Sequence, residues 1–395
     1  MNALPDAAWL NVLIEGLQTL QLQLLRLLDA LGLVAHAHGQ PAWPWAERLS
    51  GENLLIDLGQ ARRLGISVML LGLSLLVLVL ALLWRRRRIW LLGAAVLPVV
   101  LAPWPDANVV LVPAHPTSFQ QHAAGFSAEA IARGRTLYAQ NCVACHGSDG
   151  RGQGPLAAAQ PVWPPNLTGP LLWRRADGDL LWRVLHGTRD RYGALTMPGF
   201  QGRLSESDAW ALIDYMKAQA AGESLRVAGV WAQPVSPPDN MAVRCDGKPV
   251  RMLSSWRGQR MRIVAGGDNA NALLEDPRLV TVLLEREPAA ASKQDERSIA
   301  CVADSPAAWE AFSLIAATEK LEGTQLLVDR AGWLRALRAH GEPGKSAWSD
   351  DDLLCRAETA SGTATTPVAA ADGLGALITR MDAQPVRFVK GGFVH

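Results

Sequence analysis

Two cysteines and a histidine form the most chemically distinctive group in this sequence. In the segment QNCVACHGSDGRG, Cys142 and Cys145 are separated by two residues, and His146 follows directly. On one helical turn, thiols at this spacing can form thioethers with the two vinyl groups of a haem, and the next residue then lies under the iron. The motif therefore predicts a covalently attached haem c, with His146 as the proximal iron ligand.

A Cys-x-x-Cys pair has two other common uses, and neither suits this sequence. A structural zinc site needs two further ligands at a matching spacing, and the neighbouring sequence offers none. A thioredoxin-type redox pair follows a strand, whereas no strand pattern precedes Cys142. Chance is a weak explanation too, because a chain with five cysteines and eight histidines rarely produces this motif at random.

A haem that transfers electrons needs a second axial ligand, and the segment GALTMPGF supplies Met197. Its turn-rich setting predicts a loop over the opposite haem face, where a thioether stabilises ferrous iron. His186 in VLHGT and Met216 in IDYMKAQ are the competing candidates. We expect His186 to be a surface residue and Met216 to pack inside an apolar helix.

Two capped helices are expected to enclose this site. The first follows SAEAIARGRTLYAQNC, with Ser127 as its N-cap. The second follows SESDAWALIDYMKAQA, with Ser205 as its N-cap and Asp208 three residues on. The proline-rich segment PVWPPNLTGP between them predicts a loop, and Pro165 in it is expected to line the haem edge.

Small and aromatic residues predict that these two helices cross closely. Gly134 and Tyr138 lie on the first helix, and Trp210 and Tyr215 lie on the second. We expect these four residues to form the crossing.

Residues 127–222 resemble a class I c-type cytochrome domain. The resemblance is carried by the glycine and the aromatic residue of the first helix and by the segments CVACHG, PPNLT, MPGF and LSESDAWALIDYM. It implies an all-α domain that holds one haem c through Cys142 and Cys145, with His146 and Met197 as axial ligands. It also implies one-electron transfer at an exposed haem edge.

Apolar residues are concentrated before the haem motif, although the whole chain has a formal charge of only +1 and no bulk charge that favours nucleic acid. An uncharged run from Leu64 to Trp84 is long enough, as a helix, to span a bilayer core of about 30 Å. Four arginines, residues 85–88, separate it from a second apolar run, residues 89–104. The region 64–104 therefore predicts a transmembrane helical hairpin. Because short arginine-rich loops stay cytoplasmic, the sequence after the hairpin is expected in the bacterial periplasm, where covalent haem attachment is compatible with the compartment.

Residues 1–63 contain an amphipathic helix followed by a predicted periplasmic loop. Between Asn11 and Asp29 the polar residues share one face, and leucines fill the rest. Such a helix either lies flat at the membrane interface or spans the membrane with its polar stripe toward another helix, and both interpretations stay open. His36 and His38 follow it; imidazoles suit copper, but solvated loop residues are the simpler interpretation.

A second and weaker resemblance connects the hairpin to the haem motif. Residues 105–126 form a predicted linker, and the hairpin followed by PAHPTSFQQHAAGFSAEAIARGRTLYAQNCVACHG is similar to the cytochrome modules of copper-resistance D-type membrane proteins. Those proteins carry several additional spans that this sequence lacks, so the resemblance does not extend to copper transport.

Strands alternate with helices in residues 223–395, after a linker marked by glycine, proline and serine. Five runs, KPVRMLS, MRIVAGG, VTVLLERE, SIACVAD and TQLLVD, predict strands, and SPAAWEAFSLIAA predicts a helix in an α/β domain with a mixed sheet. The segments CDGKPVRMLSSWRGQRMRIVAGG and LLVDRAGWLRALR resemble the thioredoxin-like fold of peroxiredoxins and copper chaperones. Those families place reactive cysteines after the strand matching MRIVAGG, and GGDNANALLEDP has none, so we expect a non-catalytic domain for docking or stability.

Three further cysteines, Cys245, Cys301 and Cys355, lie in this C-terminal region. In an oxidising compartment two of them are expected to pair, which leaves the third as a free thiol. The sequence alone does not choose the pair.

The sequence thus predicts a multi-domain protein with N-terminal transmembrane helices, an all-α cytochrome c domain and a C-terminal α/β thioredoxin-like domain. With both axial positions filled, the leading function is a monohaem cytochrome of the bacterial inner membrane that passes single electrons to or from a larger respiratory complex. A terminal oxidase or a quinol-oxidising complex is the expected protein partner, besides membrane lipid, and no nucleic acid is expected.

Two alternatives to this electron-transfer subunit remain. The first is a periplasmic copper-homeostasis protein that combines haem c with a thioredoxin-like domain. The second is an enzyme or gas sensor in which Met197 dissociates from the iron. The leading function makes the chain part of an oxidoreductase complex rather than an enzyme alone.

Overall fold

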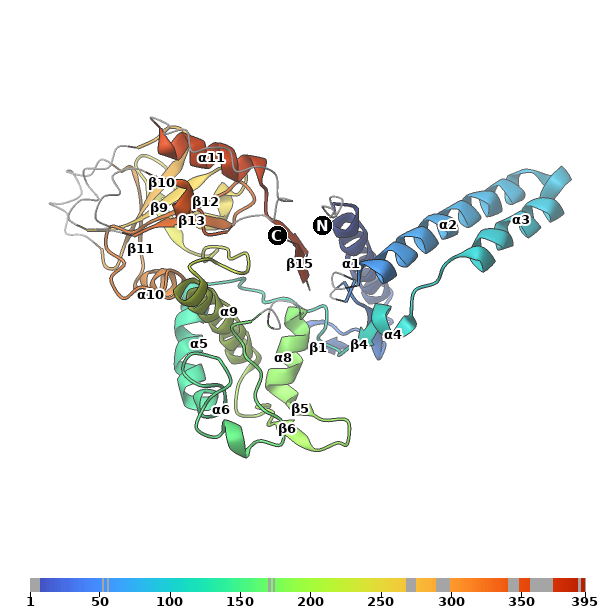
Figure 1. Ribbon diagram of the computed structural model, residues 1–395, viewed down its shortest axis with the longest axis horizontal. Coiled ribbons are helices and arrows are strands. Elements are labelled where there is room, and N and C mark those ends of the chain that lie inside the picture. The colour runs from blue at the N-terminus through green and yellow to red at the C-terminus, as the bar shows by residue number, and fades with distance from the viewer. Residues whose placement is uncertain are drawn as a thin grey trace. The chain divides into compact units, whose positions relative to one another are not determined.

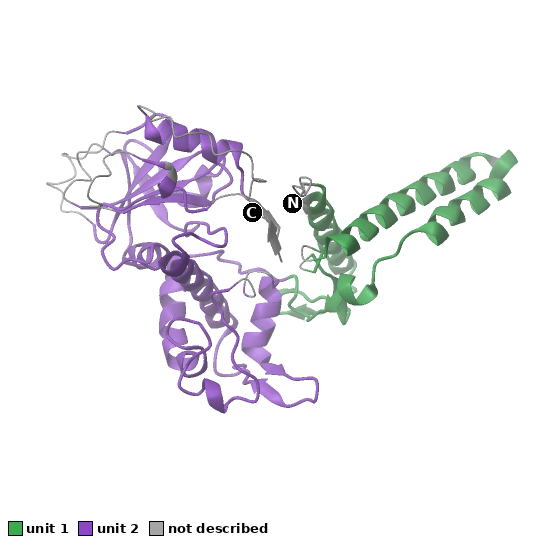
Figure 2. Cartoon of the chain, in the orientation of Figure 1, with its two compact units in different colours: residues 1–119, 389–394 green, residues 120–388, 395 purple. Residues whose placement is uncertain are grey.

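The computed structural model divides into two compact units, which Figure 2 colours separately. Unit 1 comprises residues 1–119 and 389–394, and unit 2 comprises residues 120–388 and 395. The structure describes residues 8–51, 53–54, 57–169, 172, 175–267, 275–288, 299–339, 348–355, 372–389 and 392–394.

Two helices of unit 1 form a helical hairpin (Figure 1). α2 (Leu58–Leu83) is followed by a single 3-10 turn, η1 (Arg85–Arg87), and then by α3 (Arg88–Leu101). The hydroxyl of Ser74 on α2 donates a hydrogen bond of 2.6 Å to the backbone carbonyl of Ala95 on α3. The predicted hairpin is therefore confirmed as a pair of packed helices.

Within the described ranges, α2 is the one helix that is both long enough and apolar enough to cross a membrane. It begins before the predicted Leu64, because Asp57 caps it by accepting a hydrogen bond of 3.0 Å from the backbone N–H of Gln60. α3 has 14 residues and contains Pro98, so it is shorter than the roughly 20 residues that a straight span requires. A second span stays a prediction.

The first helix of unit 1 packs against a small antiparallel ribbon. α1 (Ala8–Ala30) covers the predicted amphipathic segment. The strands β3 (Glu47–Leu49) and β4 (Leu111–Pro113) pair with each other, and the side-chain amide of Gln21 on α1 bonds to the backbone of Leu49. The other short elements of unit 1 are β1 (His36–Ala37), β2 (Gln40–Pro41) and α4 (Ala107–Val110).

Four helices in the described part of unit 2 carry or flank the Cys-x-x-Cys-His motif. They are α5 (Ala128–Asn141), α6 (Val143–His146), α8 (Asp177–His186) and α9 (Glu206–Ala228). The short elements between them are η2 (Ala157–Ala159), β5 (Thr188–Arg189) and β6 (Leu195–Met197).

Both predicted N-caps of these helices are present. The hydroxyl of Ser127 accepts a hydrogen bond of 3.1 Å from the backbone N–H of Ala130. Ser205 and Asp208 form a reciprocal capping box at the start of α9. Each cap satisfies a backbone N–H that the first helical turn leaves without a partner, so the two helix starts are fixed locally.

Gly134 allows α5 and α9 to approach each other closely. A Cβ added at Gly134 would lie 2.0 Å from the carbonyl oxygen of Ala211 and 2.6 Å from the Cβ of Tyr215. One turn further along α5, Tyr138 packs against Tyr215 with ring centroids 5.2 Å apart. The predicted crossing is confirmed at Gly134, Tyr138 and Tyr215.

A seven-stranded mixed sheet forms the core of the C-terminal half of unit 2, in the order β13-β12-β9-β10-β11-β7-β8. β9, β10 and β11 run parallel to one another, and the other pairs are antiparallel. The strands are β7 (Ala242–Cys245), β8 (Arg251–Met252), β9 (Met261–Ala265), β10 (Val280–Glu285), β11 (Cys301–Asp304), β12 (Gln325–Val328) and β13 (Leu334–Arg338). The five predicted strands and the mixed sheet are confirmed, and β7 and β13 extend the sheet.

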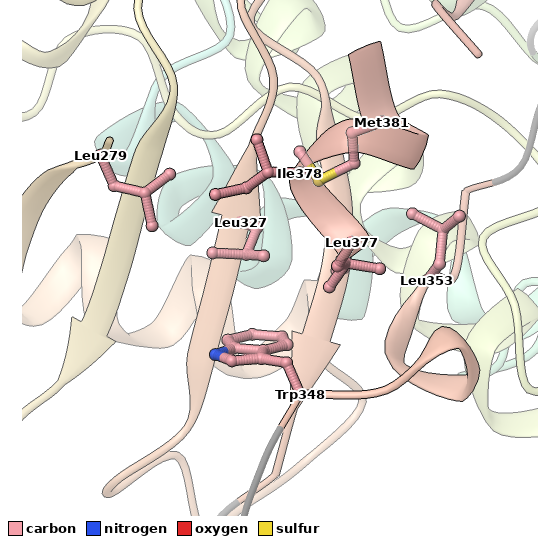
Figure 3. Packing of buried hydrophobic residues seen from close by; sticks show 8 residues of the cluster. Leu279, Leu327, Trp348, Leu353, Leu377, Ile378 and Met381 are labelled. Carbon is pink, nitrogen blue, oxygen red and sulfur yellow. The ribbon is translucent and has the colours of Figure 1, made fainter. Parts of the chain in front are cut away.

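A helix near the C-terminus buries one part of the sheet (Figure 3). Leu377, Ile378 and Met381 of α11 (Gly373–Ala383) form a buried cluster with Leu327 of β12, among other residues. Each such buried aliphatic side chain contributes roughly 2 kcal/mol relative to exposure. The remaining elements among the described residues are α10 (Pro306–Ile315), which was predicted, η3 (Leu253–Trp256), η6 (Asp350–Asp352), β14 (Arg387–Val389) and, in unit 1, β15 (Gly392–Val394).

The helical and sheet parts of unit 2 meet in a packed joint rather than a linker. The predicted boundary between residues 222 and 223 falls inside α9, which continues until Gly229 ends it with a φ of 70°. Beyond that, Trp231 is 2% exposed, and its indole donates a hydrogen bond of 3.1 Å to the carbonyl of Ile315. A Cβ at Gly222 would lie 2.0 Å from the carbonyl oxygen of Leu314. The predicted linker therefore begins as a continuation of α9, and Gly222 and Trp231 in it pack closely against the sheet part.

A disulfide joins two neighbouring strands of the sheet. Cys245 on β7 and Cys301 on β11 are directly opposite in the strand register and form the bond. Cys355 is fully buried as a free thiol, and burial raises its pKa to about 11. The structure thus selects the pair that the sequence left open.

Replacing Gly134 should separate α5 from α9. We expect Gly134→Val to lower the free energy of unfolding by about 3 kcal/mol, because the new side chain overlaps the Ala211 carbonyl. Ala139→Val is the matched control, since Ala139 is exposed on the same helix and should cost only a few tenths of a kcal/mol. Denaturant unfolding of both variants measures this difference, and equal stabilities would contradict the close crossing.

The cysteine arrangement predicts a thiol count. Of the five cysteines, two belong to the haem motif and two form the disulfide. In the haem-loaded chain, whose motif cysteines are thioethers, one free thiol, Cys355, therefore remains. We expect thiol titration of the denatured, unreduced protein to give one thiol per chain, and titration of the folded protein to give none because Cys355 is buried. Three thiols in haem-loaded protein would contradict the disulfide.

Candidate haem-binding site

The three motif residues lie on one turn that continues from α5. The backbone N–H of Cys142 donates to the carbonyl of Tyr138 at 2.9 Å, so the first cysteine ends α5. The N–H groups of Cys145 and His146 both donate to the Cys142 carbonyl, at 3.2 and 2.9 Å. Burial raises the pKa of the Cys142 thiol to about 12. The structure therefore brings both thiols and the imidazole to one turn, as the spacing predicted.

A glycine-rich loop, residues 147–154, folds back over this turn. The N–H of Gly152 donates to the His146 carbonyl at 2.8 Å, and the N–H of Gly154 donates to the Cys145 carbonyl at 3.1 Å. A Cβ at Gly152 would lie 2.2 Å from the Pro164 carbonyl oxygen, and its φ of 78° also requires glycine. The loop is therefore hydrogen-bonded to the motif turn, and at Gly152 it also packs against the proline-rich segment.

The imidazole of His146 is half-buried and suited to metal ligation. Its Nδ1 atom is buried and has no hydrogen-bond partner of normal geometry among the described residues. Burial lowers the pKa of His146, and the nearby carbonyl of Pro165 acts in the opposite direction. Pro165 therefore lies at this ring, while its place at a haem edge stays a prediction. A neutral imidazole is the form that binds iron.

Met197 is presented by a short hairpin at the end of α8. Thr188 on β5 pairs with Met197 on β6, and the Met197 side chain is half-buried. A Cβ at Gly187 would lie 2.3 Å from the Met197 carbonyl oxygen, and one at Gly199 would lie 2.6 Å from the carbonyl carbon of His186. These contacts hold the MPGF segment against the end of α8.

The two competing ligands take part in packing. Met216 is 8% exposed within α9, so the core role expected for it is confirmed. His186 is half-buried, with its ring centroid 3.7 Å from that of Trp182. His186 was expected at the surface, and the structure shows it partly covered, because the preceding turn of α8 places the Trp182 ring against it.

A half-buried histidine outside the motif connects the segment before α5 to α9. His122 Nδ1 lies 2.9 Å from an Asp214 carboxylate oxygen, and the His122 ring stacks on Trp210 at 5.6 Å. Burial raises the pKa of Asp214, and the bond to His122 opposes that change. Trp210 was expected at the helix crossing, but this stacking accounts for its position. Sequence reasoning missed the pair, since no motif links residues 92 apart.

The candidate copper ligands do not form a metal cluster. His36 Nε2 lies 3.1 Å from an Asp29 carboxylate oxygen on the exposed surface, and His38 adopts a positive φ of 54° in the turn between β1 and β2. No group of three or more potential metal-binding side chains occurs in the ranges that the structure describes. The structure therefore adds no support for copper at these histidines.

The residues around Cys142, Cys145 and His146 fit a covalently bound haem c. Two thiols and an imidazole share one turn, the buried Nδ1 atom of the imidazole lies near the Pro165 carbonyl, and glycines leave room for close backbone approach. Zinc ligation is not supported, because the described residues add no further His, Cys, Asp or Glu to make a cluster.

Comparisons with known proteins agree with this assignment. Residues 129–216 match the family described as cytochrome C oxidase, cbb3-type, subunit III. The chain is similar to the cbb3-type cytochrome c oxidase subunit CcoP of Cereibacter sphaeroides, with 35% identity over 106 residues, which are 27% of this chain and 32% of that protein. It is also similar to the cbb3-type subunit FixP of Bradyrhizobium diazoefficiens, with 32% identity over 92 residues, or 23% and 28% of the two chains.

The chain is also similar to one further curated protein and to one solved structure, and the two similarities cover different shares of the chain. The thiosulfate dehydrogenase of Stutzerimonas stutzeri is 34% identical over 101 residues, which are 25% of this chain and 30% of that protein. A solved structure, the reducing HAO-like protein complex of Kuenenia stuttgartiensis, is 24% identical, covers 32% of this chain and 59% of that chain, and has a TM-score of 0.22, too low to carry an argument. The chain thus matches about a third of the length of each curated relative. Residues 129–216 form a c-type cytochrome domain, and over this domain the chain is related to cbb3-type oxidase subunits and to thiosulfate dehydrogenase.

Proposed function

We propose that this protein is a membrane-anchored, outward-facing monohaem cytochrome that passes single electrons to or from a membrane redox complex. The observation that carries the proposal is the Cys142–His146 turn, where two thiols and a half-buried imidazole of lowered pKa are held by the glycine-rich loop. Haem c, when bound there, supplies a reversible one-electron centre.

Four residues of this chain hold the group in the proposal. Cys142 and Cys145 would form the thioethers, and His146 and Met197 would bind the iron. The MPGF segment packs closely against the end of α8, which supports Met197 as an iron ligand. A ligand on a fixed hairpin exchanges less readily than one on a free loop. With two protein ligands, no position is left for a substrate or gas.

The surface near the site supports electron exchange with another protein. Val162 and Trp163, just before Pro165 in the proline-rich loop, are 51% and 58% exposed. Exposed apolar and aromatic side chains favour docking, since such residues are enriched in the cores of protein interfaces. Electrons would therefore pass at this edge, on the side of the Pro165 loop.

The proposed partner is a larger respiratory complex, such as a terminal oxidase or a quinol-oxidising complex. Two relatives are named as subunits of cbb3-type cytochrome c oxidase, and the apolar helix α2 supports a membrane anchor beside such a complex. Tethering raises the effective concentration of the cytochrome near its partner. The four arginines after α2 and the Cys245–Cys301 disulfide support the periplasmic side of the bacterial inner membrane for both halves of unit 2.

The C-terminal sheet is proposed to be a thioredoxin-like domain without redox chemistry. The parallel β9 and β10 beside the antiparallel β12 and β13 agree with that fold. The reactive position after β9 falls in residues 268–274, which lie outside the described residues, and their sequence has no cysteine. The packed joint at Trp231 supports a stabilising or docking role.

Exchange of the proposed sixth ligand tests the function directly. We expect the ferrous parent protein to leave carbon monoxide unbound, and Met197→Ala to bind it stoichiometrically and to have a lower reduction potential, because the iron loses a thioether ligand. Absorption spectra with and without carbon monoxide measure this. Met216→Leu is the control and should behave as the parent.

Two outcomes would contradict the proposal. Binding of carbon monoxide by the native parent would favour the sensor or enzyme alternative. A new carbon monoxide complex in His186→Ala, with Met197→Ala unchanged, would move the sixth ligand to His186.

A further inference from the structure

α1 carries three distinct faces along its length. One face is buried in unit 1 and includes Leu10, Ile14, Gln21 and Leu25. A second face is apolar and exposed, and it consists of Trp9, Val12, Leu20, Leu24 and Leu27. A third face is polar and exposed, with Glu15, Thr19 and Arg26. A helix at the surface of a water-soluble protein needs only the first and third of these faces.

The exposed apolar face is too regular to be scattered surface hydrophobics. Val12 is 70% exposed, Leu20 is 64% exposed and Leu27 is 57% exposed. At 3.6 residues per turn these side chains follow one side of the helix, between the buried and polar faces. Such a mostly apolar stripe, in which Gln23 is the exposed polar residue, marks contact with a lipid or protein surface.

The buried face ties the middle of α1 to backbone that does not suit a bilayer core. The backbone N–H of Leu49 donates to the Gln21 side-chain oxygen at 2.8 Å, and the Gln21 amide donates to the Leu49 carbonyl at 3.4 Å. Leu49 belongs to the short two-stranded ribbon of β3 and β4. An open ribbon in hydrocarbon would leave polar backbone groups unsatisfied, so α1 is not a third membrane span.

Contacts with α2 fix the level at which α1 meets the membrane helix. A Cβ at Gly65 would lie 3.5 Å from the Trp9 ring and 3.9 Å from Leu13. Gly65 is at the start of the uncharged run of α2, just after Arg62 and Arg63. In Figure 1, α1 diverges from the α2–α3 hairpin instead of running along it. α1 is therefore attached where α2 leaves the aqueous phase.

We propose that α1 lies in the plane of the periplasmic surface of the membrane that α2 crosses, with its exposed apolar face in the lipid. Trp9, Val12, Leu20, Leu24 and Leu27 then enter the boundary between headgroups and acyl chains, and Glu15 and Arg26 face water. The buried face holds the anchor at a fixed angle to α2. This inference rests on the membrane placement of α2 in the proposed function, and it puts the N-terminus on the same side as the sequence after α3.

Spin labels on single introduced cysteines, in the full-length protein in liposomes, test the proposal. The positions are Val12, Leu20 and Leu27 on the apolar face, Glu15 and Arg26 on the polar face, and Leu78 within the uncharged run of α2, each replaced by cysteine. The unsubstituted parent, treated with the same label, corrects for Cys355. Power-saturation EPR with oxygen and a water-soluble nickel chelate gives the depth of each label.

For an in-plane helix, the ratio of oxygen to nickel accessibility should be several-fold higher for Val12→Cys, Leu20→Cys and Leu27→Cys than for Glu15→Cys and Arg26→Cys. The labels at Val12 and Leu27 should also lie at the same shallow depth. A spanning helix would separate them by about 22 Å along the membrane normal, which would overturn the proposal. If oxygen and the nickel chelate were both excluded from the apolar face, the in-plane membrane placement would be overturned in favour of a protein partner.

The label at Leu78 separates failure of this inference from failure of the proposed function. The label at Leu78→Cys can be deep and exposed to lipid while the labels on α1 are open to the nickel chelate. That result rejects the in-plane helix alone. A label at Leu78 that is open to the nickel chelate rejects the membrane anchor itself.

Discussion

The close crossing of α5 and α9 at Gly134 is the constraint on which the rest of unit 2 depends. With no side chain at Gly134, the two backbones approach until the Ala211 carbonyl fills the space of a Cβ. This contact fixes Tyr138, whose hydroxyl donates to the Gly147 carbonyl at 3.0 Å and so holds the turn after the haem motif. α10 of the C-terminal sheet packs against both helices as well. A single small residue therefore positions the candidate site and the neighbouring domain together.

The candidate site combines burial with exact backbone bonding. Burial raises the pKa of Cys142 and lowers that of His146, so both groups are held in their neutral forms before any ligand is bound. Hydrogen bonds from Gly152 and Gly154 to the carbonyls of the motif turn keep its shape without a side-chain contribution. Rigid backbone around reactive side chains is the arrangement that a covalently attached, low-reorganisation electron carrier requires.

Local patterns predicted the elements that local physics determines. Ser127 and Ser205 mark helix starts because capping involves neighbouring residues only, and the Cys-x-x-Cys-His spacing places two thiols and an imidazole on one turn. The strands of the C-terminal sheet followed from their short apolar runs. Gly134 was also predictable, because a glycine beside an aromatic residue in a helix has few uses other than a close crossing.

Contacts between residues far apart in the chain could not be predicted from the sequence. The bond between His122 and Asp214 joins residues with no shared motif, and the burial of Trp231 turns a glycine-rich and proline-rich stretch into a joint. The Cys245–Cys301 pair depends on the register of two strands that are not consecutive in the chain. In the same way, α1 has one amphipathic pattern in the sequence, and its division into a buried and an exposed apolar face depends on what packs against it.

The proposed functions of the amphipathic helix and the cytochrome domain are attachment and electron transfer, and the second depends on covalent attachment of haem. Intact mass spectrometry of the purified chain, produced in a bacterium that attaches haem c, tests it most directly. The account predicts the mass of the polypeptide plus one haem, retained after denaturation and lost when Cys142 and Cys145 are both replaced by serine. An unmodified mass, or a haem adduct that survives in the double variant, would contradict it.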